Sequence, residues 1–250
     1  LYSENADTRL HPASLPKMMT LYIVFEAIEN GEILPDKRVR ISRKAAAEPP
    51  SKLGLREGQR VRLRYLIRAA AVKSANEAAT AIGEAVEGSE AAFARRMNRT
   101  ANALGMTRTT FKNAHGLTER GHLSTARDMT ILGRHLFYDF SGYYHLFART
   151  TVNVGASSVP NTNRRFLRDY KGADGIKTGY LAVEKYSLAS SMKKNDRRLI
   201  AVVSGFPTKK LRSSESLKLL NWGFRNSNTF KVSEKDKSCL LYTSPSPRDQ

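Results

Sequence analysis

The stretch HPASLPKMMTLYIVFEAIEN, from His11 to Asn30, decides how the rest of the chain is interpreted. Its apolar residues recur at three- and four-residue spacing, which predicts a helix with one buried face; they are Met18, Leu21, Tyr22, Val24, Phe25 and Ile28. Ser14 lies where an N-cap or first-turn residue belongs. Pro16 is tolerated there because first-turn N–H groups have no partner inside the helix. Asn30 and Gly31 supply the stop signal.

Lys17 follows Ser14 by three residues, so the two side chains are expected on the same helical face, about one turn apart. A hydroxyl at the positive end of a helix, with an amine over it, is an arrangement that activates a nucleophile. Two further Ser-x-x-Lys matches occur at 190/193 and 191/194, in a segment that looks like a strand and its turn. The pair therefore needs support from other motifs.

The chain of 250 residues is long enough to bury a sizeable core, and its 40% hydrophobic content fits a folded globular protein. No apolar run approaches the roughly 18 residues that span a bilayer. Lys and Arg number 42 against 23 Asp and Glu, which gives a net charge of +19. Such a surface favours polyanions, among them nucleic acid, anionic lipid and an acidic wall polymer. Because no nucleic-acid motif accompanies the charge, a solvated basic surface is the simpler interpretation, and we predict no nucleic-acid partner.

Cys239 is the only cysteine, so neither an intrachain disulfide nor a cysteine metal cage is expected. The five histidines show no metal-ligand spacing, and no Gly-rich phosphate loop is present. We therefore predict neither a metal nor a nucleotide cofactor.

Both ends of the sequence call for separate interpretation. The chain starts at Leu1 in what looks like the end of a strand, so we expect the natural N-terminus and its signal peptide to be missing. The segment 239–249 resembles translated read-through of a sequencing-library adapter. We therefore expect residues 1–232 to form the domain and residues 233–250 to be a non-native tail.

The pattern predicts helices in the first half and strands in the second. Besides the opening helix, the expected helices span residues 42–50, 61–72, 77–86, 90–104, 124–140 and 211–224. Strand-like runs occur at 150–154, 174–180, 186–192 and 199–206, with a hairpin turn at 193–196. Residues 1–10 look like a strand remnant and a turn. We expect one α/β domain that carries a helical insertion.

Two short motifs extend the Ser14 site. Ser74 and Asn76 place a hydroxyl and a carboxamide two residues apart where a helix begins, although an ordinary N-cap is the simpler interpretation of this pair taken alone. Lys177, Thr178 and Gly179 lie in a predicted strand. A glycine there lets another backbone, such as a peptide substrate, approach closely, and the lysine and threonine can meet a carboxylate.

In this order the three motifs match the set typical of penicillin-binding proteins and class A β-lactamases. The chain resembles the D-alanyl-D-alanine carboxypeptidases, the low-molecular-mass penicillin-binding proteins, from Leu1 to about Val232. The similar stretches are PASLPKMMT, AAAEPPSKLGL, KSANEAA, ALGM, NAHGL, STARDM, GADGIKTGY, RRLIAVVSG and LLNWGF. The resemblance implies a β-lactamase/transpeptidase-like α/β (α+β) fold, in which helices flank an antiparallel sheet beside an all-helical subdomain.

The resemblance also implies roles for individual residues. Ser14 would be the nucleophile that forms an acyl-enzyme, Lys17 its base, and Ser74 the group that relays a proton to the leaving amine. The backbone N–H groups of Ser14 and Tyr180 would form the oxyanion hole. The residues that would hold the substrate are Asn76, Lys177, Thr178, Gly179, Tyr180 and Arg212. Three of them, Lys177, Thr178 and Arg212, would bind its terminal carboxylate.

The expected substrate is the peptidoglycan stem peptide, with β-lactams as covalent inhibitors and no cofactor. The expected location is the periplasm, at the outer face of the cytoplasmic membrane, through a C-terminal anchor that this chain lacks. A class A-like β-lactamase is disfavoured because the only loop-like glutamate between the second and third motifs, Glu119, lacks the accompanying asparagine. A non-catalytic peptidoglycan-binding envelope protein is the other alternative. Two positions depart from the family pattern. Pro16 affects the start of the helix, and the run Leu181–Lys185 affects the shape of the substrate cleft.

Overall fold

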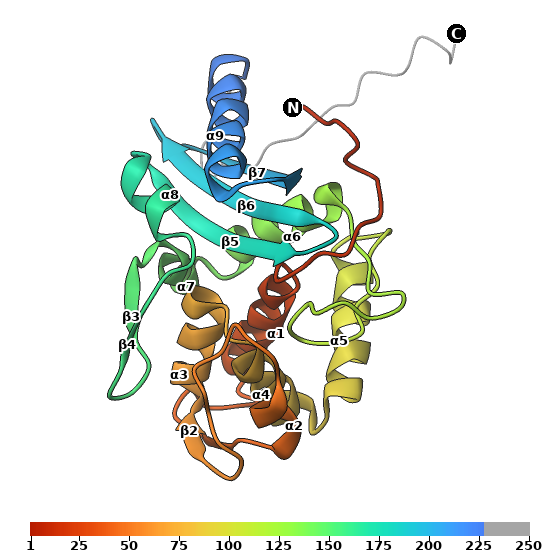
Figure 1. Cartoon of the computed structure of the whole chain (residues 1–250), viewed down its shortest axis with the longest axis vertical. Coiled ribbons are helices and arrows are strands. Elements are labelled where there is room, and N and C mark those ends of the chain that lie inside the picture. The colour runs from red at the N-terminus through yellow and green to blue at the C-terminus, as the bar shows by residue number, and fades with distance from the viewer. Residues whose placement is uncertain (228–250) are drawn as a thin grey trace, which may run out of the picture.

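The computed structural model describes residues 1–227, with a three-stranded antiparallel sheet at one end and a mostly helical region at the other (Figure 1). The sheet order is β5 (Ala173–Leu181), β6 (Lys185–Lys194), β7 (Arg197–Phe206). Asn195 and Asp196 close the β6–β7 hairpin with left-handed φ angles of 48° and 58°, which these two residue types tolerate better than most. The predicted meander and its polar turn are confirmed.

Helices cover both faces of this sheet. α9 (Lys209–Arg225) packs on one face and α6 (Ala126–Asp139) on the other (Figure 1). Along β6, Leu188 belongs to the cluster on the α9 side, whereas Ala189 belongs to the main core. Burial on both faces explains why the middle of β6 is buried without interruption instead of alternating between buried and exposed residues.

The helical region is assembled from short elements around α1 (Lys17–Glu29). They are α2 (Arg43–Ala47), α3 (Leu63–Arg68), the π-helix η1 (Ala69–Lys73), α4 (Asn76–Glu87) and α5 (Glu90–Ala103), with the two-stranded ribbon of β1 (Arg38–Arg40) and β2 (Arg60–Arg62). A second set connects this region to the sheet: α7 (Ser141–Tyr144), the 3₁₀ helix η2 (His145–Ala148), β3 (Thr151–Asn153), β4 (Ser158–Pro160) and α8 (Arg164–Asp169). The fold is thus the predicted α/β arrangement with a helical subdomain.

The opening helix differs from its prediction in two ways. It begins at Lys17, and Ser14 lies in the preceding turn without acting as a cap. That turn uses hydrogen bonds from residue i to i−3, as from Met18 N to Leu15 O (2.8 Å), which is 3₁₀ geometry. Every residue from Lys17 to Phe25 is buried. The expectation of a single apolar face is therefore wrong, because neighbouring elements enclose the first turns of α1 on all sides.

Smaller expectations also need correction. Residues 1–10 hold a turn and one isolated bridge from Leu10 to Ser124, not a strand. Val61 belongs to β2, and the helix predicted over 61–72 is α3 followed by η1. Thr125, not Ser124, caps α6. Within residues 1–227, no helix combines the length and apolarity needed to cross a membrane. The predicted domain end at 232 and the predicted tail lie outside the described residues.

Gly116 fixes the turn that carries Ser14. Its φ of 93° is left-handed, and a Cβ built on it would lie 1.7 Å from the carbonyl oxygen of Ala13 and 2.9 Å from Cδ of Pro16. The loop around Gly116 therefore approaches the Ser14 turn more closely than any residue with a side chain allows. This contact joins residues about a hundred positions apart in the sequence.

We expect Gly116→Ala to destabilise the protein by about 2–4 kcal/mol, because the clash is with backbone and the φ is unfavourable for alanine. Urea denaturation measures the change. The matched control is Gly142→Ala in α7, where the added Cβ would have no atom of residues 1–227 within 4 Å apart from its chain neighbours and the backbone of its own helix; alanine there should be neutral or stabilise by about 0.5–1 kcal/mol. Equal stability of the two variants would contradict this account.

Candidate active site

Ser14 and Lys17 meet as predicted. Lys17 Nζ lies 3.1 Å from Ser14 Oγ, 2.7 Å from Asn76 Oδ1 and 2.7 Å from the carbonyl oxygen of His115. The lysine side chain is fully buried. A neutral amine has two N–H groups and one lone pair, so it satisfies this geometry by donating to the two carbonyl oxygens and turning its lone pair to the Ser14 hydroxyl. The surroundings are therefore suited to a lysine that accepts a proton from Ser14.

The electrostatic environment favours the same state. Burial lowers the pKa of Lys17 well below the ordinary value, and the charge of Lys177 lowers it further. The carboxylates of Glu48 and Glu77 act in the opposite direction. Burial dominates because the charged amine has lost its hydration and has no carboxylate in direct contact among the described residues.

A second hydroxyl–amine pair is formed by Ser74 and Lys177. Lys177 Nζ donates to Ser74 Oγ at 2.7 Å and to the carbonyl oxygen of Thr178 at 3.0 Å. Ser74 ends η1 with a left-handed backbone, φ 63° and ψ 34°, a conformation that costs a serine energy and is found disproportionately at functional sites. Burial lowers the pKa of Lys177 to about 7, with a smaller contribution from the charge of Arg212.

Asn76 is the first residue of α4 and contacts Lys17 instead of being open to the solvent. Its amide nitrogen donates to the carbonyl oxygen of Pro49 at 2.8 Å. In this state both ends of the side chain are occupied within the protein. Asn76 therefore orients Lys17, and its predicted contact with a substrate amide requires its nitrogen to leave Pro49.

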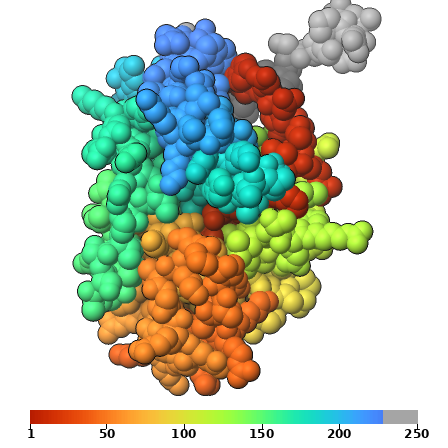
Figure 2. Space-filling view, viewed as in Figure 1, coloured from red at the N-terminus to blue at the C-terminus, as the bar shows by residue number. Residues whose placement is uncertain are grey.

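The end of β5 lies beside the nucleophile turn. A Cβ built on Gly179 would lie 3.0 Å from Ala13 Cβ and 3.4 Å from Ser14 N, so only a residue without a side chain fits here comfortably. Thr178 Oγ1 donates to Thr162 Oγ1 at 2.8 Å, and the exposed ring of Tyr180 lies 4.5 Å from that of Tyr186. In Figure 2 a small area of red surface from the N-terminal residues lies where the orange helical region, the teal β5–β6 end and the yellow-green loop meet.

Arg212 is buried on α9, 6% exposed, and has no carboxylate partner within residues 1–227. It donates to Ser213 Oγ at 3.2 Å, and its Nε has no hydrogen-bond partner among the residues that the structure describes. Burial lowers its pKa from the ordinary value. Its charge acts on Lys177, so the two cations lie in one region that suits an anionic group.

The other two Ser-x-x-Lys matches form no such pair. Ser190 Oγ lies 2.6 Å from Ser216 Oγ inside the sheet region, and Ser191 Oγ accepts from Arg198. Lys193 is exposed and pairs with Asp196 in the hairpin turn. Residues three apart on a strand point to opposite faces, which explains why the same spacing works only at the start of α1.

Sequence reasoning missed several groups that the fold brings to the site. They are the carbonyl oxygen of His115, the hydroxyl of Thr162, and a buried group made by Glu48, Glu90 and His115. The ligand atoms of that last group lie within 4.8 Å of one another, a geometry that metal sites also have. Glu48 and His115 lie in two of the stretches that carry the family resemblance, but their separation in sequence hides their contact.

The arrangement defines a class of site. It combines a serine hydroxyl beside a buried lysine, a second serine–lysine pair, and a strand end beside the nucleophile. Such a site can support acyl transfer through a serine ester. The family profile described as D-alanyl-D-alanine carboxypeptidase (Peptidase_S11) matches residues 1–208. The chain belongs to this family.

Individual relatives agree with this assignment. The chain is 37% identical over 243 residues to D-alanyl-D-alanine carboxypeptidase DacF of Bacillus subtilis (strain 168), which covers 95% of this chain. It superposes with a TM-score of 0.90 and 36% identity on penicillin binding protein 5 from Haemophilus influenzae, over 96% of this chain and 71% of that one. Penicillin-Binding Protein D2 from Listeria monocytogenes, in its cefotaxime-bound form, gives a TM-score of 0.81 at 31% identity, over 89% and 91% of the chains. The chain spans 62% of the length of the Bacillus relative.

We expect both buried lysines to lose their proton below the ordinary lysine pKa of about 10.4, Lys177 near 7. Competitive acetylation with acetic anhydride across a pH series, read by mass spectrometry, gives the midpoint of each amine, with the remaining lysines as internal references. Lys177→Met should raise the midpoint of Lys17, because the variant removes a repelling charge. A Lys17 midpoint near 10.4 in the unmodified chain would contradict the burial argument.

Proposed function

We propose that this chain is the catalytic domain of a serine-type D-alanyl-D-alanine carboxypeptidase that removes the terminal D-alanine from peptidoglycan stem peptides. The observation that carries the proposal is the fully buried Lys17 amine 3.1 Å from Ser14 Oγ, with the β5 strand end beside them. Membership of the family and the names of the relatives support the same reaction.

The geometry supports the following acylation step. Ser14 Oγ attacks the carbonyl carbon between the two D-alanines, and its proton passes to the lone pair of Lys17. The C–N bond breaks, and the proton that Lys17 took passes through Ser74 Oγ, which Lys177 holds at 2.7 Å, to the leaving amine, so that Lys17 is neutral again. Water then hydrolyses the Ser14 ester with Lys17 again as base. Metal chemistry has no part in this route.

The same geometry suggests how charge is stabilised and how substrate is held. The backbone N–H groups of Ser14 and Tyr180 serve as the oxyanion hole, where losing one donor typically costs about 3 kcal/mol. Lys177, Thr178 and Arg212 receive the terminal carboxylate, and Gly179 admits the substrate backbone. Arg212 suits this role because its guanidinium is buried and has no acidic partner in the part of the chain that the structure describes.

Two alternatives remain distinguishable by experiment. A β-lactamase would turn penicillin over rapidly, whereas a carboxypeptidase holds it as a long-lived ester; the Listeria relative was solved with cefotaxime bound. A peptidoglycan-binding envelope protein would form no ester. Glu119 is exposed, and its Oε2 accepts from Asn113 at 3.2 Å. Within residues 1–227 it forms no hydrogen bond with Ser14 or Lys17, which disfavours it as the glutamate that activates a deacylating water. We place the reaction in the cell envelope, where the stem peptide is; the membrane anchor stays a prediction.

We expect a fluorescent penicillin to label the chain at Ser14, located by mass spectrometry, and Ser14→Ala to abolish both labelling and D-alanine release. The matched control is Ser190→Ala, which removes the serine of another Ser-x-x-Lys match but leaves the site intact. Labelling that survives Ser14→Ala, or that is lost equally in the control, would overturn the proposal.

We expect Arg212→Ala to lower kcat/KM for D-alanyl-D-alanine peptides about 10²-fold or more, since a charged hydrogen bond to the carboxylate is lost. Acylation by a β-lactam without an equivalent contact should fall much less. Lys210→Ala, an exposed cation two residues earlier on α9, is the control and should change neither. Equal losses for peptide and β-lactam would contradict the carboxylate role.

A further inference from the structure

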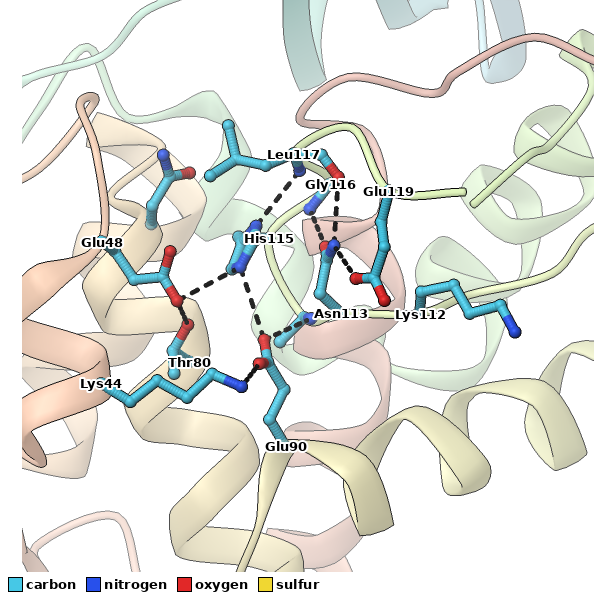
Figure 3. Close-up of polar contacts among 12 residues, drawn as sticks. Lys44, Glu48, Thr80, Glu90, Lys112, Asn113, His115, Gly116, Leu117 and Glu119 are labelled. Atoms are coloured by element: carbon cyan, nitrogen blue, oxygen red, sulfur yellow. Dashed lines mark hydrogen bonds and ion pairs between the residues drawn. The ribbon is translucent and has the colours of Figure 1, made fainter. Parts of the chain in front are cut away.

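Behind Lys17, three buried ionisable side chains form a cluster that the mechanism above does not use. His115 Nε2 lies 3.3 Å from Glu48 Oε1 and 3.4 Å from Glu90 Oε1 (Figure 3). Thr80 donates to the same Glu48 oxygen at 2.9 Å, the Ala114 N–H donates to Glu90 Oε1 at 3.2 Å, and Lys44 forms an ion pair with Glu90. The three residues come from segments far apart in the sequence.

The position of the proton on the His115 ring decides whether this cluster can bind a metal ion. The N–H of Leu117 donates to His115 Nδ1 at 3.1 Å, so Nδ1 presents its lone pair and the neutral ring carries its proton on Nε2 (Figure 3). A metal would need the Nε2 lone pair. In this tautomer Nε2 instead presents its N–H to the two carboxylates. The cluster is therefore arranged as a hydrogen-bonded support and not as a metal site.

This support is joined directly to the catalytic lysine. The carbonyl oxygen of His115 accepts from Lys17 Nζ at 2.7 Å, while the ring of the same residue is fixed by Glu48, Glu90 and Leu117. The next residue after Glu48 provides a second link, because the Pro49 carbonyl accepts from Asn76, which in turn accepts from Lys17. Both of the carbonyl contacts that orient Lys17 thus depend on the segment at Glu48.

The two glutamates of the cluster differ in charge balance. Lys44 pairs with Glu90, so the charge of Glu90 is compensated locally. Burial raises the pKa of Glu48, but the contacts with His115 and Thr80 and the charge of Lys44 outweigh it and hold the pKa below the ordinary value. Glu48 is therefore a buried carboxylate that stays ionised at neutral pH and acts on Lys17.

We propose that Glu48 is a positioning residue for the acylation step: through His115 it holds the carbonyl that orients Lys17, and its charge helps to set the protonation state of that amine. This inference rests on the proposed function, in which Lys17 must be neutral to accept the Ser14 proton. The charged groups that act on Lys17 are Lys177 from β5, Glu77 from α4 and Glu48 itself. Around His115 the charged groups are Glu90 and Lys44, and burial keeps the remaining titratable group, His122, neutral by lowering its pKa to about 3.

The sign of the effect follows from these charges. Glu48 raises the pKa of Lys17, against the larger effect of burial and the charge of Lys177. Replacing the carboxylate by an amide removes that contribution, so Lys17 loses its proton at a lower pH. The rate of acylation rises as Lys17 becomes neutral, and its acid limb should therefore move to lower pH.

The experiment measures the second-order rate of acylation by a fluorescent penicillin from pH 4 to 10 in wild type, Glu48→Gln and Glu90→Gln. We expect the acid limb of Glu48→Gln to shift down by about half a pH unit or more, as expected for a nearby carboxylate at an effective dielectric constant of about 20. Glu90→Gln is the matched control. It removes the other carboxylate that contacts His115 Nε2, but the charge of that carboxylate is already balanced by Lys44. Its limb should stay at the wild-type position.

A purely structural role would change the height of both profiles and leave both limbs in place. That result, or equal shifts in the two variants, would overturn the inference. If Glu48→Gln does not fold, Glu48→Ser removes the same charge with a smaller side chain and is expected to give the same shift. Competitive acetylation of Lys17 measures its titration midpoint without any catalysis, so it tests the inference even if no penicillin ester forms. The absence of an ester would count against the proposed function and not against this inference.

Discussion

The burial of one amine is the constraint on which the rest of this structure depends. Lys17 has lost its hydration, and within residues 1–227 its amine hydrogen-bonds only with carbonyl and hydroxyl oxygens, from Ser14, Asn76 and His115. An ammonium group in such surroundings is costly, because a buried charge needs a close counter-charge. The fold meets that cost by favouring the neutral amine, which is the state that a base requires. The chemistry of the site is therefore a consequence of packing around the first turn of α1.

The second lysine extends the same logic to binding. Lys177 is also buried, and the nearby charge of Arg212 adds to its cost. Neither group has an acidic partner in the described region, so their charged forms lower the stability of the protein, and a carboxylate bound by both would recover part of that energy. A terminal carboxylate is the group that distinguishes the end of a peptide from its middle. Under the proposed function, the electrostatic cost of burying these groups and the selectivity for chain ends would have one physical source.

Much of this was predictable from the sequence, and the failures have physical reasons. Hydrophobic periodicity and caps placed the main helices and the three strands of the meander, because these signals act over a few residues. The motif residues Ser14, Lys17, Ser74 and Lys177 were found through their order along the chain, and the fold brings them together. The group formed by Glu48, His115 and Glu90 was not found, since no local pattern joins positions 42 and 67 residues apart. Only the long-range contact at Gly116 and the packing of α2, α4 and α5 create it.

The local expectations failed most clearly at the two serines. Ser14 was expected at the N-cap or in the first turn of α1, and an N-cap was the alternative interpretation of Ser74, yet within residues 1–227 neither side chain caps a helix: Ser14 lies in a 3₁₀ turn and Ser74 has a left-handed backbone at the end of a π-helix. A capping serine directs its oxygen to backbone N–H groups of its own helix, which fixes its hydroxyl in an orientation that does not serve a lysine partner. The irregular backbone releases each hydroxyl from that local role and turns it to an amine. Departures from regular helix geometry are concentrated where the hydroxyl has to react, because reactivity and helix capping compete for the same oxygen.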